Sequence, residues 1–408
     1  MIIANNKKMN TEIKVFNKPK LVYIPLISGN DTNITVLVNK GEYVYKGSII
    51  GKRKGDFRIP IHSSVSGIVV DFEEKTCLNG TLVKCVVIEN DFKEKILPRE
   101  EVKTKYTKEE FIECLKENGI VGMGGSGFPT YIKYDVKKIK TLIVNGVECE
   151  PYLRSDYVLA YNKCEEILEA IDTILEINNI DEAIIVFRKN NNDLKELFDN
   201  YIGTYLKIKI VVVSNDYPNG WERQLISKVM NVEYNNLPIE QGIVVSNIST
   251  IYAIYEALKY NKPLIERVIT FTGDGFKKPC NMLVKIGTKL SDIINEIGIN
   301  DNTFLVAGGP MMGVKVDEEL VVSANLNGVL CLNEKEDKRA NPCIKCGKCV
   351  SVCPAKLSPV LIMENFNNKK ELIPLKPQKC VECGLCSYIC PANILVREYV
   401  KKAKREVR

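Results

Sequence analysis

The sequence predicts a multidomain protein that combines α+β and α/β units, and three observations support this class. The chain has 408 residues, more than one hydrophobic core usually organises, so we expect three or four domains. Short strands broken by glycine fill residues 21–89, whereas strands and helices alternate over residues 107–260. Two closely similar cysteine runs follow near the carboxyl end, where we expect a mainly helical module.

Composition narrows the class further. The content of 45% hydrophobic and 26% charged residues is typical of a soluble globular protein. No stretch approaches the roughly 18 apolar residues that span a bilayer. The first residues resemble no signal peptide, so we expect a reducing cytosol and fifteen cysteines without disulfides. We find no nucleic-acid motif. The only histidine is His62, which argues against histidine catalysis and leaves the chemistry to cofactors.

The domains are expected in the following order. Residues 1–19 are polar and predict a mobile lead-in. Residues 20–95 predict a small β-barrel or sandwich, and the phrases around Gly41–Gly51 and Pro60–Val69 resemble biotinyl- or lipoyl-type barrel-sandwich hybrid domains. Because no lysine-bearing carrier tip is present, we interpret this domain as a scaffold.

Residues 96–262 predict an α/β domain with a largely parallel sheet. Its expected elements are a helix over 107–118 with a Thr107/Glu110 capping box, strands at 141–145, 182–187 and 207–213, and a helix over 157–177. Residues 263–330 predict a small β-grasp-like module, residues 331–400 the cysteine-bearing module, and residues 401–408 a basic tail. The tail could touch an anionic membrane or an acidic partner, or could be a solvated helix end.

The two cysteine runs share the spacing C-x2-C-x2-C-x3-C-P, which is the bacterial spacing for iron–sulfur ligands. Three thiolates converge on one cluster from a tight loop, and the fourth ligates the other cluster. A zinc pair is the alternative, but zinc sites need no C-x2-C-x2-C triple. We therefore expect two [4Fe–4S] clusters, the first held by Cys343, Cys346, Cys349 and Cys390, and the second by Cys380, Cys383, Cys386 and Cys353.

A glycine-rich loop is the second informative segment, with glycines at positions 122, 124, 125 and 127. Such density lets backbone N–H groups face an anion without obstruction from side chains. No Gly-Lys-Ser/Thr follows the loop, so it is not a P-loop and ATP chemistry is not expected. The loop follows a helix, whereas the glycines of a Rossmann fingerprint follow a strand, so the match to that fingerprint is weak. The alternative is a flexible loop. Because clusters pass single electrons and soluble carriers give two, the loop points to FMN.

Four segments resemble the C subunits of Rnf-type ion-translocating ferredoxin:NAD oxidoreductases: Gly122–Thr130, Asn145–Tyr152, Tyr217–Gly220 and Gly308–Gly313. The order of barrel-sandwich hybrid, α/β FMN/NADH-binding domain, β-grasp (SLBB) module and dicluster ferredoxin also matches. The flavin domain is similar to the NADH-oxidising subunit of respiratory complex I. The resemblance implies an electron-transfer enzyme subunit between NAD(H), FMN, two clusters and a low-potential partner. It also implies a peripheral position on the cytoplasmic side of a membrane complex, with a ferredoxin or flavin-carrier subunit as partner.

The resemblance also implies roles for individual residues. The FMN phosphate and ribityl chain would contact the loop glycines Gly122, Gly124, Gly125 and Gly127, and Lys133 would be the cation. Asn145 would bond the flavin or the ribityl chain. Three further residues would lie on the phosphate side: Ser246, Asn247 and Thr250. Glu148 and Glu150 would lie beside the isoalloxazine and the incoming nicotinamide.

The sequence departs from the family pattern in three places. An opening Gly-Gly-x-His-Pro-Pro segment is missing, Ser28–Asn33 replaces the usual barrel segment, and Trp221 stands where a small residue is common. The first two departures concern docking to the usual membrane partners. They leave open a soluble electron-transfer adaptor that feeds a reductase, like the electron-transfer protein of proline reductase systems, without ion translocation. A subunit whose clusters only stabilise the fold is a third alternative.

Overall fold

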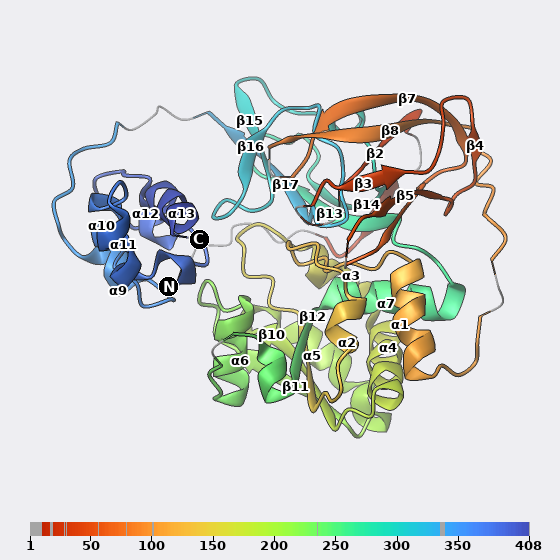
Figure 1. Ribbon diagram of the computed structural model, residues 1–408, viewed down its shortest axis with the longest axis horizontal. Helices are drawn as coiled ribbons and strands as arrows, with labels where there is room; N and C mark the ends of the chain where they lie inside the picture. Colours follow the sequence, from red (N-terminus) through yellow and green to blue (C-terminus); the bar gives the residue numbers. More distant parts are fainter. Residues whose placement is uncertain are drawn as a thin grey trace.

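The computed structural model describes residues 10–16, 19–27, 29, 31–55, 57–78, 80–99, 102–234, 236–334 and 339–407. Figure 1 shows two β-rich units lying together above an α/β domain, with a helical carboxyl-terminal module beside them. Within the described ranges, no helix is both long and apolar enough to cross a membrane.

The amino-terminal unit is an antiparallel sandwich. One sheet has the order β2-β8-β7-β4 and the other the order β3-β5-β6. The core between them is aliphatic and includes Ile24, Ile50 and Ile88. Its strands are β2 (Leu21–Pro25), β3 (Ile34–Val36), β4 (Tyr43–Val44), β5 (Ile49–Arg53), β6 (Pro60–His62), β7 (Gly67–Thr76) and β8 (Leu82–Asn90).

The α/β domain contains a four-stranded parallel sheet of order β11-β10-β9-β12. Its strands are β9 (Thr141–Asn145), β10 (Glu182–Arg188), β11 (Ile208–Val213) and β12 (Ile243–Asn247). Its helices are α1 (Lys108–Glu117), α2 (Tyr131–Tyr134), α3 (Ser155–Asn162), α4 (Cys164–Ile177), α5 (Asn192–Asp199), α6 (Glu222–Met230) and α7 (Ile248–Tyr260). Successive strands add on one side of β9 until β12 returns to its other side, which creates a topological switch point.

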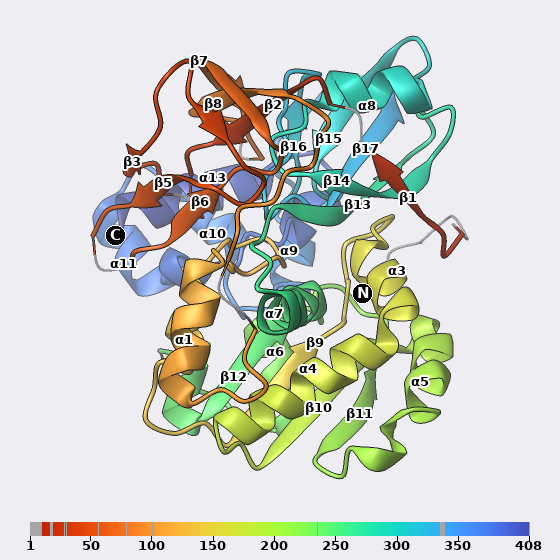
Figure 2. The same cartoon turned by 90° about the vertical axis from the view of Figure 1, so that its right-hand side faces the viewer.

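Two apolar clusters place the helices on opposite faces of this sheet. The larger cluster joins α1, α4 and α7 to the sheet, and the smaller one joins α6 to the other face. Figure 2 shows α4 and α7 in front of the strands. The capping box expected at Thr107 and Glu110 is confirmed. The single helix expected over 157–177 is wrong, because the chain turns at Lys163 and lets α3 pack on the next domain while α4 packs on α7.

A six-stranded mixed sheet of order β1-β14-β13-β17-β15-β16 forms the third unit. Its elements are β1 (Ile13–Phe16), β13 (Glu266–Thr272), β14 (Cys280–Lys285), α8 (Leu290–Ile297), β15 (Thr303–Ala307), β16 (Val314–Val316) and β17 (Gly328–Asn333). The expectation of a mobile lead-in is wrong for β1, which pairs in parallel with β14. Phe16 anchors it because its ring is buried in this unit's core. Residues 1–9, 17 and 18 lie outside the described residues.

The carboxyl-terminal module is helical, as expected. Its helices are α9 (Lys348–Ser351), α10 (Pro359–Glu364), α11 (Lys369–Leu375), α12 (Leu385–Tyr388) and α13 (Val396–Glu406). The core contains Ile362, Leu372 and Val400. A short 3-10 helix at Pro377–Lys379 lies in this module, and three others lie in the α/β domain, at Lys189–Asn191, Ile202–Thr204 and Pro238–Gln241. The basic residues at 401, 402, 404 and 405 continue α13 because Ala403 is buried in this core, so the limit expected at residue 400 falls inside a helix.

Candidate functional site

The glycine loop lies at the switch point of the parallel sheet. Its base is closed by hydrogen bonds from the Gly122 amide to the Phe128 carbonyl (2.8 Å) and from the Gly127 amide to the Gly122 carbonyl (3.1 Å). The Met123 amide donates to the Thr250 hydroxyl at 2.9 Å, and Thr250 lies in the first turn of α7. The loop therefore rests on the amino terminus of a 13-residue helix, where the helix dipole favours an anion.

Three of the four glycines serve different purposes. A Cβ at Gly127 would lie 2.7 Å from the Gly29 Cα, and one at Gly124 would lie 3.3 Å from Asn247, so these two allow close packing. Gly125 has φ +117° and a Cβ there would meet no atom within 4 Å. Among the described residues, the amides of Gly124, Gly125 and Ser126 donate to no protein group. These residues fit an anionic group such as a flavin phosphate.

Two asparagines end the two strands that flank the switch point, in register with each other. Asn145 donates to the Gly220 carbonyl at 2.8 Å and accepts from the Val147 amide at 3.0 Å. Asn247 caps α7 by accepting from the amides of its first turn. Both side chains therefore hold the backbone around the site.

Lys133 and Ser246 lie near the carboxyl end of β12. The Lys133 ammonium donates to the Val245 carbonyl at 2.7 Å, and burial lowers the pKa of this lysine. Ser246 is buried and its hydroxyl lies 3.0 Å from that of Tyr134. The structure thus gathers the loop, Lys133, Ser246, Asn247 and Thr250 around the β12–α7 junction.

Glu148 lies in a buried polar network. Its carboxylate accepts from the Ser155 hydroxyl (3.0 Å) and from the Asp156 amide (3.3 Å), at the start of α3. Burial, reinforced by the neighbouring Asp156 carboxylate, raises the pKa of Glu148 to about 7. Asp156 in turn accepts from the side-chain Nδ2 of Asn247 at 2.7 Å, so this network supports the cap of α7.

Sequence reasoning missed Asp156 and Arg267. The Arg267 guanidinium is fully buried in β13 and donates to the Ala324 carbonyl at 2.6 Å and the Met123 carbonyl at 3.4 Å. It thereby ties the glycine loop to the neighbouring unit. A Ser-Asp pair at a helix start was the only local signal for Asp156, and nothing in the sequence pattern distinguishes Arg267.

The raised pKa of Glu148 predicts a pH effect on stability. A carboxyl group whose pKa rises on folding stabilises the fold below its unfolded pKa and loses that contribution as pH rises through the folded pKa. We expect the Tm to fall between pH 5 and pH 8, and to fall less in Glu148→Gln, whose side chain stays neutral. Scanning calorimetry checks this, with surface Glu240→Gln as the control; parallel curves for the wild type and Glu148→Gln would refute it.

Glu150 lies in a different environment, at the junction of three units. Its carboxylate accepts from the Met311 amide at 3.1 Å. A Cβ at Gly309 would lie 2.1 Å from the same carboxylate, so the β15–β16 turn presses directly on it. The Tyr217 hydroxyl lies 3.5 Å from Glu150 and 2.8 Å from the Cys383 carbonyl, to which it donates. Burial raises the pKa of Glu150 to about 7. The structure does not bring Glu148 and Glu150 to one surface.

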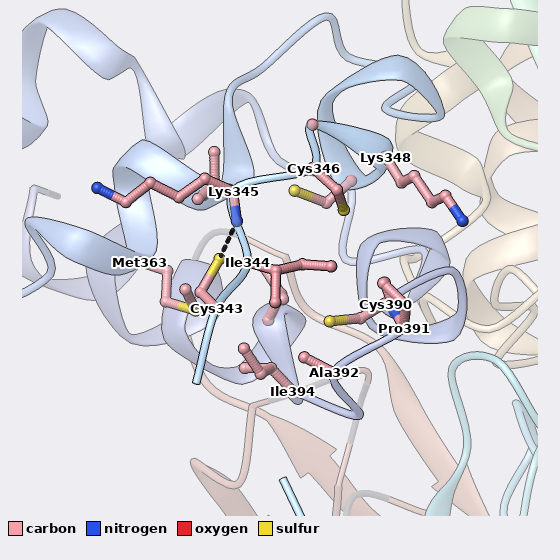
Figure 3. A pocket seen from close by; sticks show the side chains of 14 residues that line it. Cys343, Ile344, Lys345, Cys346, Lys348, Met363, Cys390, Pro391, Ala392 and Ile394 are labelled. Carbon is pink, nitrogen blue, oxygen red and sulfur yellow. Dashed lines mark hydrogen bonds between the residues drawn. The ribbon is translucent and has the colours of Figure 1, made fainter. Parts of the chain in front are cut away.

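The eight cysteines of the two runs line two separate pockets of similar size. The first is lined by Cys343, Cys346, Cys349 and Cys390, and the second by Cys353, Cys380, Cys383 and Cys386. Figure 3 shows three of the first four thiols from two different segments around one space. The grouping is the crossed one that the spacing predicts.

Local geometry in the two loops is nearly the same. The Lys345 amide donates to the Cys343 sulfur at 3.4 Å, and the Glu382 amide donates to the Cys380 sulfur at 3.3 Å. Lys345 and Glu382 both have positive φ, +53° and +58°. Amide donors directed at thiolates are one means by which proteins stabilise iron–sulfur clusters and set their potentials.

Comparison with known proteins agrees with these features. Family models match for a Nuo51 FMN-binding domain over residues 115–256, an RnfC barrel-sandwich hybrid domain over residues 2–93 and a 4Fe-4S dicluster domain over residues 342–394. The fold is similar to that of NAD⁺-reducing [NiFe]-hydrogenase in its H2-reduced state, with a TM-score of 0.53 and 16% identity over 74% of this chain and 63% of that one. The chain is thus a protein with an FMN-binding domain and a 4Fe–4S dicluster domain.

Curated relatives identify the family. The chain is 34% identical to the C subunit of the Na⁺-translocating ferredoxin:NAD⁺ oxidoreductase complex of Acetobacterium woodii, over 85% of this chain and 81% of the relative. It is 32% identical to the C subunit of the proton-translocating complex of Clostridium ljungdahlii, over 86% of this chain and 80% of the relative. The chain belongs to the family of C subunits of Rnf complexes.

Proposed function

We propose that this protein transfers electrons between NAD(H), FMN, two [4Fe–4S] clusters and a low-potential partner, as a component of an Rnf-type ion-translocating complex. The observation that carries the proposal is the contact between the two cofactor-binding regions. Tyr217 of the FMN-binding domain donates to the carbonyl of Cys383, which lines the second cysteine pocket. The two candidate cofactor sites therefore belong to one continuous structure, as electron transfer between them requires.

The flavin site is assigned to the glycine loop and the β12–α7 junction. FMN, when bound, supplies the exchange between two-electron and one-electron carriers. The free amides of Gly124 and Gly125 would bind the phosphate, and Lys133, held at the Val245 carbonyl, would add positive charge to the site. Thr250 holds the loop, and Asn247 holds the helix terminus. Asn145, bonded to the Gly220 carbonyl and the Val147 amide, would orient the backbone on the flavin side of the site.

The cluster sites follow the two pockets. Cys343, Cys346, Cys349 and Cys390 bind one cluster, and Cys353, Cys380, Cys383 and Cys386 bind the other, with amide donors to Cys343 and Cys380 stabilising the thiolates. Thiolate-rich ligand sets with C-x2-C-x2-C spacing favour iron–sulfur clusters over a single metal ion.

The finer architecture is part of the proposal. The order β14-β13-β17-β15-β16 with α8 crossing between β14 and β15 supports a β-grasp module of the SLBB kind. We retain domain limits at 20–95, 96–262, 263–330 and 331–400, with β1 added to the β-grasp sheet and α13 extending the last module. The partners would be other subunits of the complex, including a ferredoxin or flavin-carrier subunit, on the cytoplasmic side of the membrane.

One observation favours the adaptor alternative. Glu150, expected beside the nicotinamide, is packed against Gly309 and accepts from Met311, so its carboxylate is already occupied by the protein. A chain with this arrangement could keep the flavin and receive electrons from a donor other than NADH. It would then feed a soluble reductase.

Anaerobic stopped-flow reduction distinguishes the two functions. Protein reconstituted with FMN, iron and sulfide is mixed with NADH, and flavin and cluster absorbance are followed separately. We expect NADH to bleach the flavin first and the clusters next, with dithionite as the reference for full reduction. Reduction by dithionite but not by NADH would support the adaptor. Clusters that neither donor reduces would support a structural role.

A further inference from the structure

The two cysteine loops have the same local geometry but opposite surroundings. Gly347 and Gly384 occupy equivalent places in the two runs and have similar φ, +72° and +80°. A Cβ at Gly384 would lie 2.5 Å from the Met311 carbonyl, whereas a Cβ at Gly347 would meet no atom within 4 Å. One loop is therefore pressed against the protein, and the other faces open space.

Further contacts hold the walls of the second cysteine pocket, to which the inner loop contributes. Arg397 donates to the Met311 carbonyl at 2.7 Å, and Gln224 of the FMN-binding domain donates to the Pro354 carbonyl at 2.9 Å. Cys383 and Leu385 are buried there with Tyr217. The second pocket is thus enclosed between the helical module and the flavin domain.

Most of the outer loop is exposed, with Cys343 and Cys349 half-buried. Ile344 is 67% exposed, and Lys345, Cys346 and Lys348 are also exposed. Figure 3 shows the two lysine side chains extending away from the cysteine-lined space, on either side of it. We name Ile344, Lys345 and Lys348 the outer rim. It surrounds the pocket through which an electron would reach the surface of the protein.

The outer rim belongs to a strongly basic module. Residues 339–407 contain thirteen Lys or Arg and five Asp or Glu, a net charge of +8, and the rest of the chain therefore has −2 of the total of +6. Residues 341–351 contain no acidic residue. The carboxylate of Glu364 lies 3.6 Å from the Lys345 ammonium in an exposed ion pair. Such a pair holds Lys345 weakly.

We propose that the outer rim is the docking surface for a one-electron carrier protein with an acidic face, and that the proposed function operates through it. Lysines steer and orient an acidic partner, and the exposed isoleucine gives close apolar contact at the centre. In each encounter one electron passes between the cluster held by Cys343, Cys346, Cys349 and Cys390 and the carrier. One is oxidised and the other reduced by one electron, with no proton or bond transferred. This surface rests on the proposed function only in requiring that cluster.

The test compares charge reversal on the outer rim with charge reversal elsewhere. The variant combines Lys345→Glu with Lys348→Glu, and the control combines Lys137→Glu with Lys138→Glu, two exposed lysines of the flavin domain. Each protein is reduced with dithionite, freed of excess reductant and mixed with an oxidised acidic ferredoxin. We expect the second-order rate constant to fall roughly ten- to a hundredfold for the rim variant only, and its dependence on ionic strength to weaken.

Two further measurements separate docking from other effects. Affinity for the oxidised ferredoxin is measured by calorimetry on the oxidised proteins, and we expect it to weaken only in the rim variant. A neutral variant, Lys345→Gln with Lys348→Gln, should give an intermediate rate, and cluster potentials are determined for every variant. Equal rates and affinities in rim and control variants would overturn the proposal. A rate loss fully explained by a changed cluster potential would also overturn it. So would a rim variant that keeps its affinity for ferredoxin and loses only its binding to anionic lipid vesicles. Because dithionite replaces NADH, failure of NADH to reduce the flavin would overturn the proposed function without affecting this result.

Discussion

Replacing Gly125 by valine is expected to abolish FMN binding while leaving the iron and sulfide content near that of the wild type. A Cβ at this position meets no protein atom within 4 Å, and the neighbouring amides have no protein partner among the described residues, so the free space lies in front of the donors. A branched side chain would occupy that space. The φ of +117° is also unfavourable for valine. The backbone would have to change this angle, and the change would tilt the amides away from the phosphate that they bind together.

The control must share the backbone strain without the site. Gly55 has φ +86° and a Cβ there would also meet no atom within 4 Å, but it lies after β5 in the barrel domain. We expect Gly55→Val to retain FMN at wild-type stoichiometry. Flavin is measured by fluorescence after acid release, and iron by colorimetry. Full flavin content in Gly125→Val would place the cofactor elsewhere, and equal loss in both variants would indicate a general folding defect.

Features defined by short-range spacing were predictable. The crossed grouping of the eight cysteines follows from two identical C-x2-C-x2-C-x3-C-P runs, because the loop brings three thiols together and directs the fourth away. The glycine loop was also visible in the sequence as four glycines in six positions, and its association with residues 246–250 came from the family resemblance. The spacing within each run and the glycine content of the loop are local features, whereas the meeting of the two runs and the contact of the loop with α7 are tertiary.

Features defined by distant partners were not predictable. Glu148 and Glu150 are two residues apart, yet one caps α3 and the other meets the β15–β16 turn. Only the placement of Met311, 161 residues further on, separates them. The buried Arg267 and the pairing of β1 with β14 likewise depend on tertiary contacts that no local pattern encodes. For this reason the sequence and the family resemblance suggest one common role for Glu148 and Glu150, beside the flavin and the nicotinamide.

The second large effect is expected from comparing two cysteine variants that the sequence alone would treat as equivalent. Cys346→Ala and Cys383→Ala should each remove one cluster and leave the other, because the two pockets share no cysteine. Their consequences for electron flow should differ. Cys383 is buried beside Tyr217 of the flavin domain, whereas Cys346 is exposed on the far loop.

We therefore expect Cys346→Ala to keep rapid reduction of its remaining cluster by the flavin, since that cluster borders the flavin domain. In Cys383→Ala the remaining cluster is the outer one, and electron transfer rates fall steeply with the distance that must be crossed. Its reduction through the flavin should be slower by orders of magnitude, although dithionite should still reduce it. Cys114→Ala, which replaces a cysteine of α1 outside both pockets, serves as the control.

Freeze-quenched EPR spectroscopy after reduction of the flavin measures this difference directly. The flavin is reduced by NADH, or by light in a deazaflavin mixture if the chain does not accept NADH, and the cluster signal is followed with time. Iron content near half of the wild-type value in both cysteine variants, with an intact EPR signal after dithionite, verifies that the module has folded around the remaining cluster. Equally fast cluster reduction in both variants would contradict the order that the buried and exposed loops imply. The reverse difference would place the flavin next to the outer loop and would overturn the order inferred from the contact between Tyr217 and Cys383.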